Sequence, residues 1–349
     1  MTTTHNTPPS NDDPLIEQRK KDHVEITRFK DVQSELTTGL ERYHYMHRAL
    51  PDLNLDAVDT AITVFGKRLA APILISSMTG GILEGTPINR TLAAAAQHAG
   101  IAMGLGSQRA AIIRPELAET FRVRDVAPDI LLFANVGAVQ LNYGFTVDDY
   151  RRAVDMAETD ALILHFNALQ EAVQPEGDRD FSGLLPKLET LCRTIGVPVI
   201  AKEVGWGFSK EDIRRLVSVG VNAIDVAGAG GTSWSQVESF REMTEVQQTI
   251  ARAFVGWGIP TADAIRYVRE AAPDMPIFAS GGLKDGIDVA KCITLGASLG
   301  GFAQRFIKVA DQGVDAVIRL IEIVRQQLQI TMFMTASADI AALRKAEMS

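Results

Sequence analysis

The stretch PVIAKEVGWGFSKEDIRRLVSVGVNAIDVAG, residues 198–228, contains one complete strand–helix–strand unit. Its apolar runs PVIAKE (198–203) and AIDVAG (223–228) have the length of buried strands. Between them, residues 210–220 carry apolar side chains at three- and four-residue spacing, which is typical of an amphipathic helix, and Gly220 stands where such a helix ends. Strands joined through a helix pair in parallel by a right-handed crossover. The stretch therefore predicts an α/β fold.

The same pattern recurs from Pro72 onward. Amphipathic helices are expected at 88–100 and 146–159, for example, between short apolar runs. Eight units in roughly 230 residues fit a closed (β/α)8 TIM barrel better than an open doubly wound sheet, which is the alternative. The eight apolar runs lie at 72–77, 101–106, 130–135, 161–166, 198–203, 223–228, 276–282 and 299–304.

The N-terminal part of the chain lies outside this repeat. Residues 1–14 are polar and contain proline, which predicts a flexible tail, and residues 15–349 are predicted to form a single domain. Residues 15–64 are expected to be irregular. Their basic run, Arg19 to His23, is expected to fold over the barrel mouth as a substrate clamp.

Two later segments also depart from the repeat. The longest interval, at about 232–262, is expected to be an insertion that forms a lid or an extra helix. The chain after Arg305 is predicted to be a C-terminal helical segment that closes the barrel.

The composition indicates a globular enzyme, with 46% hydrophobic and 22% charged residues. A net charge of −8 argues against non-specific nucleic-acid binding. Cys192 and Cys292 are far apart and lack the spacing of metal ligands, so they indicate a reduced compartment. Because no apolar stretch reaches the roughly 18 residues of a membrane span and the N-terminus lacks an apolar signal core, we expect a cytoplasmic protein.

Glycine or a hydrogen-bonding residue follows almost every predicted strand. Active sites of TIM barrels lie at the carboxyl ends of the strands, where all eight ends meet. The pattern therefore predicts one shared site, rather than eight solvated loops. The groups are Ser77 to Gly81, Gly104 to Arg109, Asn135, His165 to Glu171, Lys202 with Glu203, Ala227 to Thr232, Ser280 to Gly286, and Gly300 to Gln304.

The run ALILHFNALQE (161–171) places polar residues at the end of an aliphatic strand. His165 and Asn167 point the same way because strand side chains alternate, and Gln170 and Glu171 are expected on the loop beyond. One carboxylate, with substrate phosphates and water, is the usual way of holding Mg²⁺, which makes Glu171 a candidate metal ligand. We find no pair of carboxylates at the predicted mouth that is suited to general acid–base catalysis.

Two glycine-rich turns, at 280–286 and 300–304, follow the strands where barrels commonly bind phosphate. The hydroxyl of Thr232 could bind the same anion. Residues 106–109 offer a hydroxyl, an amide and the Arg109 guanidinium, a set suited to a diphosphate.

Lys202 ends the strand at 198–203, and its sequence context leaves three roles open. It could form a Schiff base, stabilise an anionic ring such as that of a reduced flavin, or pair only with Glu203 or Asp225.

The motifs RK…H, MTGG, GSQR, HFNALQE, KE, GGT and SGG occur in this order, and the chain resembles the type 2 isopentenyl-diphosphate isomerases over about residues 15–345. The resemblance implies an FMN-dependent barrel that interconverts isopentenyl diphosphate and dimethylallyl diphosphate in isoprenoid biosynthesis. It also implies reduced FMN and Mg²⁺ as cofactors, NADPH as reductant, and a homo-oligomer, either a tetramer or an octamer.

The resemblance implies roles for individual residues as well. Flavin contacts are implied for Ser77, Met78, Thr79, Ser107, Asn135, Lys202 and Thr232, and contacts to the FMN phosphate for Gly281, Gly282, Leu283, Ala303 and Gln304. Substrate contacts are implied for Arg19, Lys20, Ser107, Gln108, Arg109, His165, Asn167 and Gln170. Gln170, His165 and Lys202 would be catalytic, with Gln170 near the reacting carbons, and Glu171 would bind Mg²⁺. Ala168, Ala227 and Lys284 depart from the Pro, Ser and Arg found at these positions in relatives.

Two alternative functions remain open at this point. One is another FMN-dependent barrel oxidoreductase, such as a 2-hydroxy-acid oxidase, which needs a His/Arg pair for a carboxylate substrate that we do not find. The other is a non-catalytic sensor that binds a flavin or a phosphometabolite.

Overall fold

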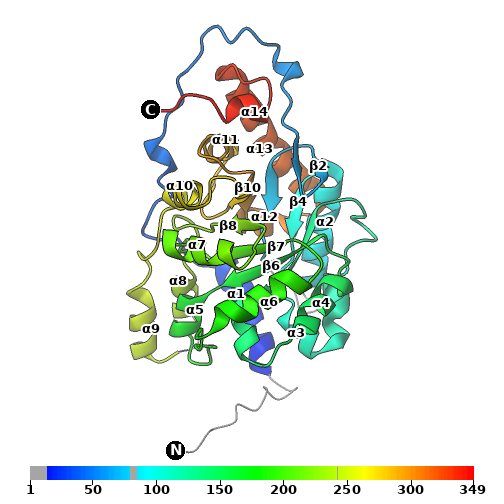
Figure 1. The fold of residues 1–349 in the computed structure, drawn as a ribbon, viewed down its shortest axis with the longest axis vertical. Helices are drawn as coiled ribbons and strands as arrows, with labels where there is room; N and C mark the ends of the chain where they lie inside the picture. The colour runs from blue at the N-terminus through cyan, green and yellow to red at the C-terminus, as the bar shows by residue number, and fades with distance from the viewer. Residues whose placement is uncertain (1–13, 79–84, 242) are drawn as a thin grey trace, which may run out of the picture.

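The computed structural model describes residues 14–78, 85–241 and 243–349. Eight parallel strands close into a barrel in the order β10-β3-β4-β5-β6-β7-β8-β9 (Figure 1). Every strand overlaps one of the eight predicted runs, and only β5 extends beyond its run, by two residues, which confirms the TIM barrel and excludes the open sheet. The strands are β3 (Ile73–Ile75), β4 (Ala102–Gly104), β5 (Leu132–Gly137), β6 (Ala161–Phe166), β7 (Val199–Glu203), β8 (Ala223–Asp225), β9 (Ile277–Ala279) and β10 (Leu299–Phe302).

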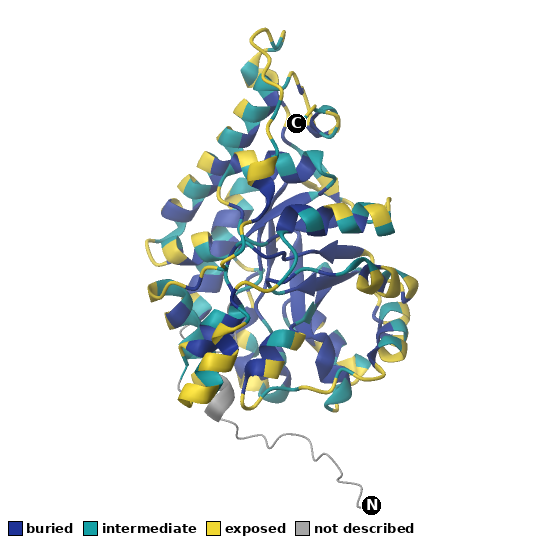
Figure 2. Cartoon of the chain, turned by 90° about the vertical axis from the view of Figure 1, so that its left-hand side faces the viewer, coloured by how far each residue is buried: buried dark blue, intermediate teal, exposed yellow. Residues whose placement is uncertain are grey.

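Helices surround the barrel, and their outward faces are exposed while the strands are buried (Figure 2). None of the helices in the described part of the chain is long and apolar enough to cross a membrane. The longer helices are α2 (Thr86–Ala99), α4 (Val147–Met156), α6 (Leu184–Thr194), α7 (Lys210–Ser218), α10 (Thr261–Ala271), α11 (Gly286–Thr294) and α13 (Val314–Met334). Shorter ones are α3 (Arg109–Ile113), α5 (Ala168–Val173), α8 (Trp234–Ser239), α9 (Glu245–Arg252), α12 (Gln304–Ala310) and α14 (Ile340–Leu343), with 3-10 turns η1 (Leu40–Arg42), η2 (Leu55–Ala57), η4 (Pro115–Phe121) and η5 (Ala138–Asn142).

An aromatic stack fills the barrel interior. Phe133 of β5 and Phe278 of β9 are fully buried, and their ring centroids lie 5.7 Å apart. Phe65 packs edge-on against both rings from a hairpin formed by β1 (Ile62–Val64) and β2 (Lys67–Leu69). The hairpin packs against one end of the interior and leaves the carboxyl ends of the strands for the functional site.

Replacing Phe133 by alanine is expected to lower the free energy of unfolding by about 3–5 kcal/mol, because the change removes the stack and leaves a cavity. Urea denaturation followed by far-UV circular dichroism measures this loss. Phe29→Ala, at a position where 76% of the residue is exposed, is the control. Equal stability losses for the two variants would show that the stack does not support the barrel.

The N-terminal segment is more regular than its sequence suggests. We expected 15–64 to be irregular, but α1 (Pro14–Phe29) forms a helix of 16 residues that packs against α8 and α12. That prediction was wrong because α1 docks largely through polar atoms: Ile26 joins a small apolar cluster, whereas His23 contacts Glu238 and the Thr27 carbonyl accepts from Gln304. A helix that docks through polar side chains lacks the apolar periodicity by which helices are recognised in a sequence.

Candidate functional site

A cavity of about 650 Å³ lies at the carboxyl ends of the barrel strands. Its lining draws on α1, on α5 and on the loops that follow the strands. Most of the residues predicted for the site line this cavity: Arg19, Lys20, Ser77, Met78, Ser107, Arg109, Asn135, His165, Asn167, Gln170, Glu171, Lys202, Thr232, Gly281, Gly282, Leu283, Ala303 and Gln304. The departures noted above fall here too, since Ala227 and Lys284 line the cavity and Ala168 begins α5.

Two predicted residues are not found in the lining. Thr79 lies outside the described residues. Gln108 is fully buried; its Nε2 donates to the Ala153 carbonyl at 2.7 Å and its Oε1 accepts from the Asn135 N–H at 2.9 Å. The predicted contact of its side chain with diphosphate is therefore corrected to a structural role, because both ends of the amide are engaged by backbone.

Backbone packs directly against backbone in the glycine-rich part of the cavity. Gly281 and Gly282 adopt φ of 106° and 81°, a region that favours glycine. A Cβ on Gly281 would collide with the Gly228 carbonyl oxygen, and one on Gly282 with the Gly230 carbonyl oxygen. Only glycine lets these two turns approach each other, and the resulting concave main chain has the form of a phosphate cradle.

Lys202 is 7% exposed and lies on the cavity wall. Its Nζ donates to the Glu203 carbonyl at 2.9 Å and lies 3.6 Å from an Asp225 carboxylate oxygen. The other Asp225 oxygen accepts from Ser280 Oγ at 2.6 Å. Lys202 therefore has a counter-ion in Asp225 and still faces the cavity.

Glu203 does not share this ion pair. One carboxylate oxygen accepts the backbone N–H groups of residues 204–207 at 2.6 to 3.2 Å. Burial raises the pKa of Glu203 to about 7, although these N–H groups and Lys202 oppose the shift. Glu203 thus shapes the loop after β7.

His165 is held by Asn135 in one orientation. Nδ1 of His165 lies 2.7 Å from Asn135 Oδ1, and Asn135 Nδ2 donates to the Leu105 carbonyl at 3.1 Å. Because the amide is fixed with its oxygen toward the ring, we assign the proton of the neutral imidazole to Nδ1. Burial, followed by the charges of Lys202 and Arg109, lowers the pKa of His165 to about 3. The ring is therefore neutral at pH 7.

Cationic side chains crowd the same part of the cavity. Arg19 and Lys20 come from α1, Arg109 begins α3, and Lys202 ends β7. Lys20 Nζ donates to the Ser107 carbonyl at 3.0 Å. This concentration of positive charge in an acidic protein predicts an anionic ligand.

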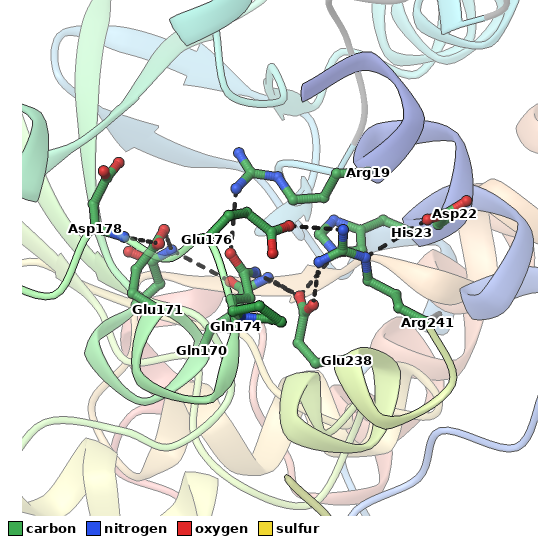
Figure 3. A network of polar contacts seen from close by, with 12 residues as sticks. Arg19, Asp22, His23, Gln170, Glu171, Gln174, Glu176, Asp178, Glu238 and Arg241 are labelled. Carbon is green, nitrogen blue, oxygen red and sulfur yellow. Dashed lines mark hydrogen bonds and ion pairs between the residues drawn. The ribbon is translucent and has the colours of Figure 1, made fainter. Parts of the chain in front are cut away.

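Polar side chains of α5 interlock at the cavity wall (Figure 3). Gln170 and Glu171 lie on this helix, not on the loop that we predicted, and Asn167 precedes it. Asn167 Nδ2 donates to Glu171 Oε1 at 2.7 Å and to Gln170 Oε1 at 3.3 Å. Burial raises the pKa of Glu171, with Arg19 opposing the shift. The three side chains are thus fixed relative to one another.

Sequence reasoning missed Glu238, a fully buried carboxylate on α8. It accepts from Gln170 Nε2 at 2.9 Å and Gln174 Nε2 at 2.6 Å, and it lies 2.8 Å from His23 Nε2 and 2.9 Å from Arg241 Nη1 (Figure 3). Burial would raise the pKa of Glu238, but His23, Gln170 and Arg241 together hold it at about 2. Glu238 is therefore a second carboxylate near Glu171, but its low pKa keeps it ionised at neutral pH. The expectation that the mouth holds no pair of carboxylates suited to general acid–base catalysis stays a prediction.

The sequence indicated one part of this network, the pair of glutamines. Gln174 follows Gln170 by four residues, which places both amides on one face of a helix. Glu238 carried no such signal: it lies in the predicted insertion at 232–262, where Thr232 was the only residue singled out.

Among the residues that the structure describes, no group of three or more His, Cys, Asp or Glu side chains could hold a metal ion. A cation here would be bound by Glu171, by neutral oxygen ligands and by an anionic ligand, which is a set that suits Mg²⁺ rather than Zn²⁺.

Comparisons with known proteins agree with this geometry. Residues 148–349 match the FMN-dependent dehydrogenase family. An isopentenyl-diphosphate delta-isomerase from Rickettsia felis is 52% identical over 330 residues, which are 95% of this chain and 96% of that protein. One from Rickettsia bellii (strain RML369-C) is 51% identical over 331 residues, 95% of this chain and 97% of that protein.

Solved structures with a similar fold include a mandelate oxidase with (S)-2-phenylpropionate, at a TM-score of 0.64 and 20% identity over 96% of this chain and 97% of that one. A mandelate oxidase variant with a monooxide FMN adduct has a TM-score of 0.65 and 19% identity over 94% of this chain and 92% of that one. At this identity the likeness shows the fold alone.

Proposed function

Because the chain belongs to the FMN-dependent, type 2 isopentenyl-diphosphate delta-isomerases, we propose that it interconverts isopentenyl and dimethylallyl diphosphate with reduced FMN and Mg²⁺. The observation that carries this proposal is the presence of two different anion-binding arrangements in one cavity. One is the glycine cradle around Gly281 and Gly282, and the other is the cationic group of Arg19, Lys20 and Arg109. The first suits the phosphate of FMN and the second suits a diphosphate.

The residues present fit a bound FMN. Ser76 and Ser77 line the cavity, and among the described atoms their buried hydroxyl oxygens have no hydrogen-bond partner. Such hydroxyls are available to a ligand, since buried polar groups are rarely left unpaired. Lys202 places a positive charge beside the same space. The FMN phosphate would bind at Gly281, Gly282, Leu283, Ala303 and Gln304; when reduced, the flavin supplies a ring that can carry a proton.

The substrate would bind beside the network on α5. Arg19, Lys20, Ser107, Arg109, His165 and Asn167 would hold the diphosphate, and Glu171 would hold Mg²⁺. Gln170 would face the reacting carbons, with its amide fixed by Glu238 and Asn167. NADPH as the reductant and a tetramer or octamer remain predictions from the family resemblance, and a cytoplasmic location remains a prediction from the sequence.

An anaerobic assay tests this function. Purified protein with FMN, Mg²⁺ and dithionite is expected to convert isopentenyl diphosphate to dimethylallyl diphosphate, followed by proton NMR, and to stop when the flavin is oxidised or EDTA is added. Oxidation of mandelate instead would favour the 2-hydroxy-acid oxidase, and bound flavin without any turnover would favour the sensor.

The affinity for diphosphate is expected to fall as pH rises above neutrality. Burial, followed by the charges of Arg19, Arg114 and Arg109, lowers the pKa of Lys20 to about 7. A bound diphosphate favours the ammonium and raises this pKa, so the contribution of Lys20 to binding is complete below about pH 7 and is lost as the pH rises toward the pKa of the complex.

Calorimetric titration with pyrophosphate from about pH 6 to about pH 9 measures this effect, which amounts to at most about tenfold in Kd per pH unit. Lys20→Arg keeps its charge over this range and is expected to flatten the profile. Ionisation of pyrophosphate is the same for both proteins, so parallel profiles would remove Lys20 from the diphosphate site.

A further inference from the structure

Asp178, in the loop after α5, joins the two halves of the proposed diphosphate site. Its Oδ2 accepts from Arg109 Nη1 at 2.5 Å and from Gln140 Nε2 at 3.0 Å. Its main-chain N–H donates to Glu171 Oε2 at 2.7 Å, and Figure 3 shows the two acidic residues side by side. One residue thus contacts both the arginine expected to bind the anion and the carboxylate expected to bind the metal.

The loop that carries Asp178 lies close against α5. A Cβ on Gly177 would overlap the main-chain carbonyl of Glu171, so only glycine lets the residue before Asp178 lie this close to α5. The Arg109 and Asp178 side chains are each only 13% exposed, which limits screening of their charges by water. The ion pair is therefore a largely buried contact of Arg109, which lines the cavity, and not a loose surface contact.

In this arrangement, the Asp178 carboxylate opposes the binding of a diphosphate at Arg109. The Asp178 carboxylate occupies one arm of the Arg109 guanidinium, and its negative charge repels a phosphate that approaches the same arginine. A divalent cation between the two acidic groups and the diphosphate would reverse the repulsion.

Oxygen ligands for such a cation stand close by. Gln140 Oε1 and Asn167 Oδ1 are buried and, among the described atoms, have no hydrogen-bond partner. The same two side chains donate to Asp178 and to Glu171 through their nitrogen atoms. Neutral amide oxygens beside two carboxylates are ligands that Mg²⁺ accepts, directly or through water.

We propose that Asp178 and the substrate diphosphate compete for Arg109, and that Mg²⁺ relieves the competition by drawing the Asp178 carboxylate toward Glu171. Asp178 is then the positioning residue that makes diphosphate binding depend on the metal. This inference rests on the proposed function, since it requires that Arg109 bind a diphosphate and Glu171 bind Mg²⁺.

Calorimetric titration of the oxidised, FMN-loaded protein with pyrophosphate tests the proposal, with Mg²⁺ in one series and EDTA in the other. Asp178→Asn keeps an oxygen for Arg109 and removes the charge. The variant is expected to bind pyrophosphate about tenfold more tightly in EDTA, and the ratio of its two Kd values, without and with Mg²⁺, should be at least about fivefold smaller than in the unmodified protein. Formation of magnesium pyrophosphate in solution is the same for both proteins and cancels in the comparison.

Glu176→Gln is the matched control, because it removes a carboxylate from the same loop that pairs with Arg241 at 2.7 Å and not with Arg109. It should leave both Kd values unchanged. Asp178→Ser, which keeps a hydroxyl acceptor, serves as a second variant if Asp178→Asn fails to fold.

Two results would overturn the inference while leaving the proposed function intact: unchanged Kd values in Asp178→Asn, or a weakening by the same factor with and without Mg²⁺. The second would mean that Asp178 only supports Arg109. Failure of the unmodified protein to bind pyrophosphate in either series would instead contradict the proposed function, and the inference with it.

Discussion

Replacing Gln170 by alanine is expected to lower kcat by about 100-fold or more while leaving the affinity for FMN unchanged. The amide lines the cavity and is 8% exposed. Its Nε2 donates to Glu238 and its Oε1 accepts from Asn167, so the group is held in one orientation. A group fixed this way can place a donor at the reacting carbons, whereas the proposed FMN phosphate site lies at the glycine turns on other strands.

The test separates chemistry from cofactor binding. kcat is measured anaerobically with reduced flavin, and the Kd of FMN by quenching of flavin fluorescence. Gln312→Ala, at an exposed position, is the control. Equal losses of turnover and of FMN affinity would show that Gln170 supports the cavity as a whole and does not act on the substrate.

Replacing Gly281 by alanine is expected to weaken FMN binding by at least about 100-fold. Two penalties combine at this position. Its φ of 106° is unfavourable for alanine, and the added methyl group would push apart the turns at Gly228 and Gly281. If the main chain there cradles the phosphate, its N–H groups are displaced together.

A substitution at a second glycine distinguishes the effect of backbone strain from the effect of steric overlap. Gly196 also has a positive φ, 88°, but a Cβ there meets no atom within 4 Å. Gly196→Ala should therefore lose some stability and still bind FMN. Reconstitution of the apoprotein with FMN measures both variants. Full FMN binding by Gly281→Ala, or loss of binding in both, would contradict the assignment of the cradle.

The barrel could be predicted from local sequence because each strand and helix carries its own periodicity. The polar ends of β5 and β6 could be read in the same way, since Asn135 and His165 end apolar runs on strands that pair in the barrel. Gln108 was misjudged because its neighbours Ser107 and Arg109 line the cavity, while its own side chain turns into the protein.

The rest of the site depends on contacts between distant segments. Glu238 meets Gln170 across 68 positions of the chain, and Asp178 meets Arg109 across 69. Residue spacing in the sequence does not predict contacts between positions so far apart. The helix α1 was missed for a related reason, because its contacts with α8 and α12 include polar atoms that match only after the barrel has formed.

The docking of α1 has a consequence for the order in which the molecule assembles. Its His23, Thr27 and Arg28 contact residues 215, 277 and 283 positions later. During synthesis the helix therefore leaves the ribosome long before Glu238, Gln304 and Asp311 exist to receive it. Closing so wide a loop is entropically unfavourable until the barrel brings the partners together. The docking of α1 is therefore expected to follow the formation of these partners. A nascent chain that lacks β10 and α12 contains the barrel strands up to β9 but not all the residues that α1 contacts.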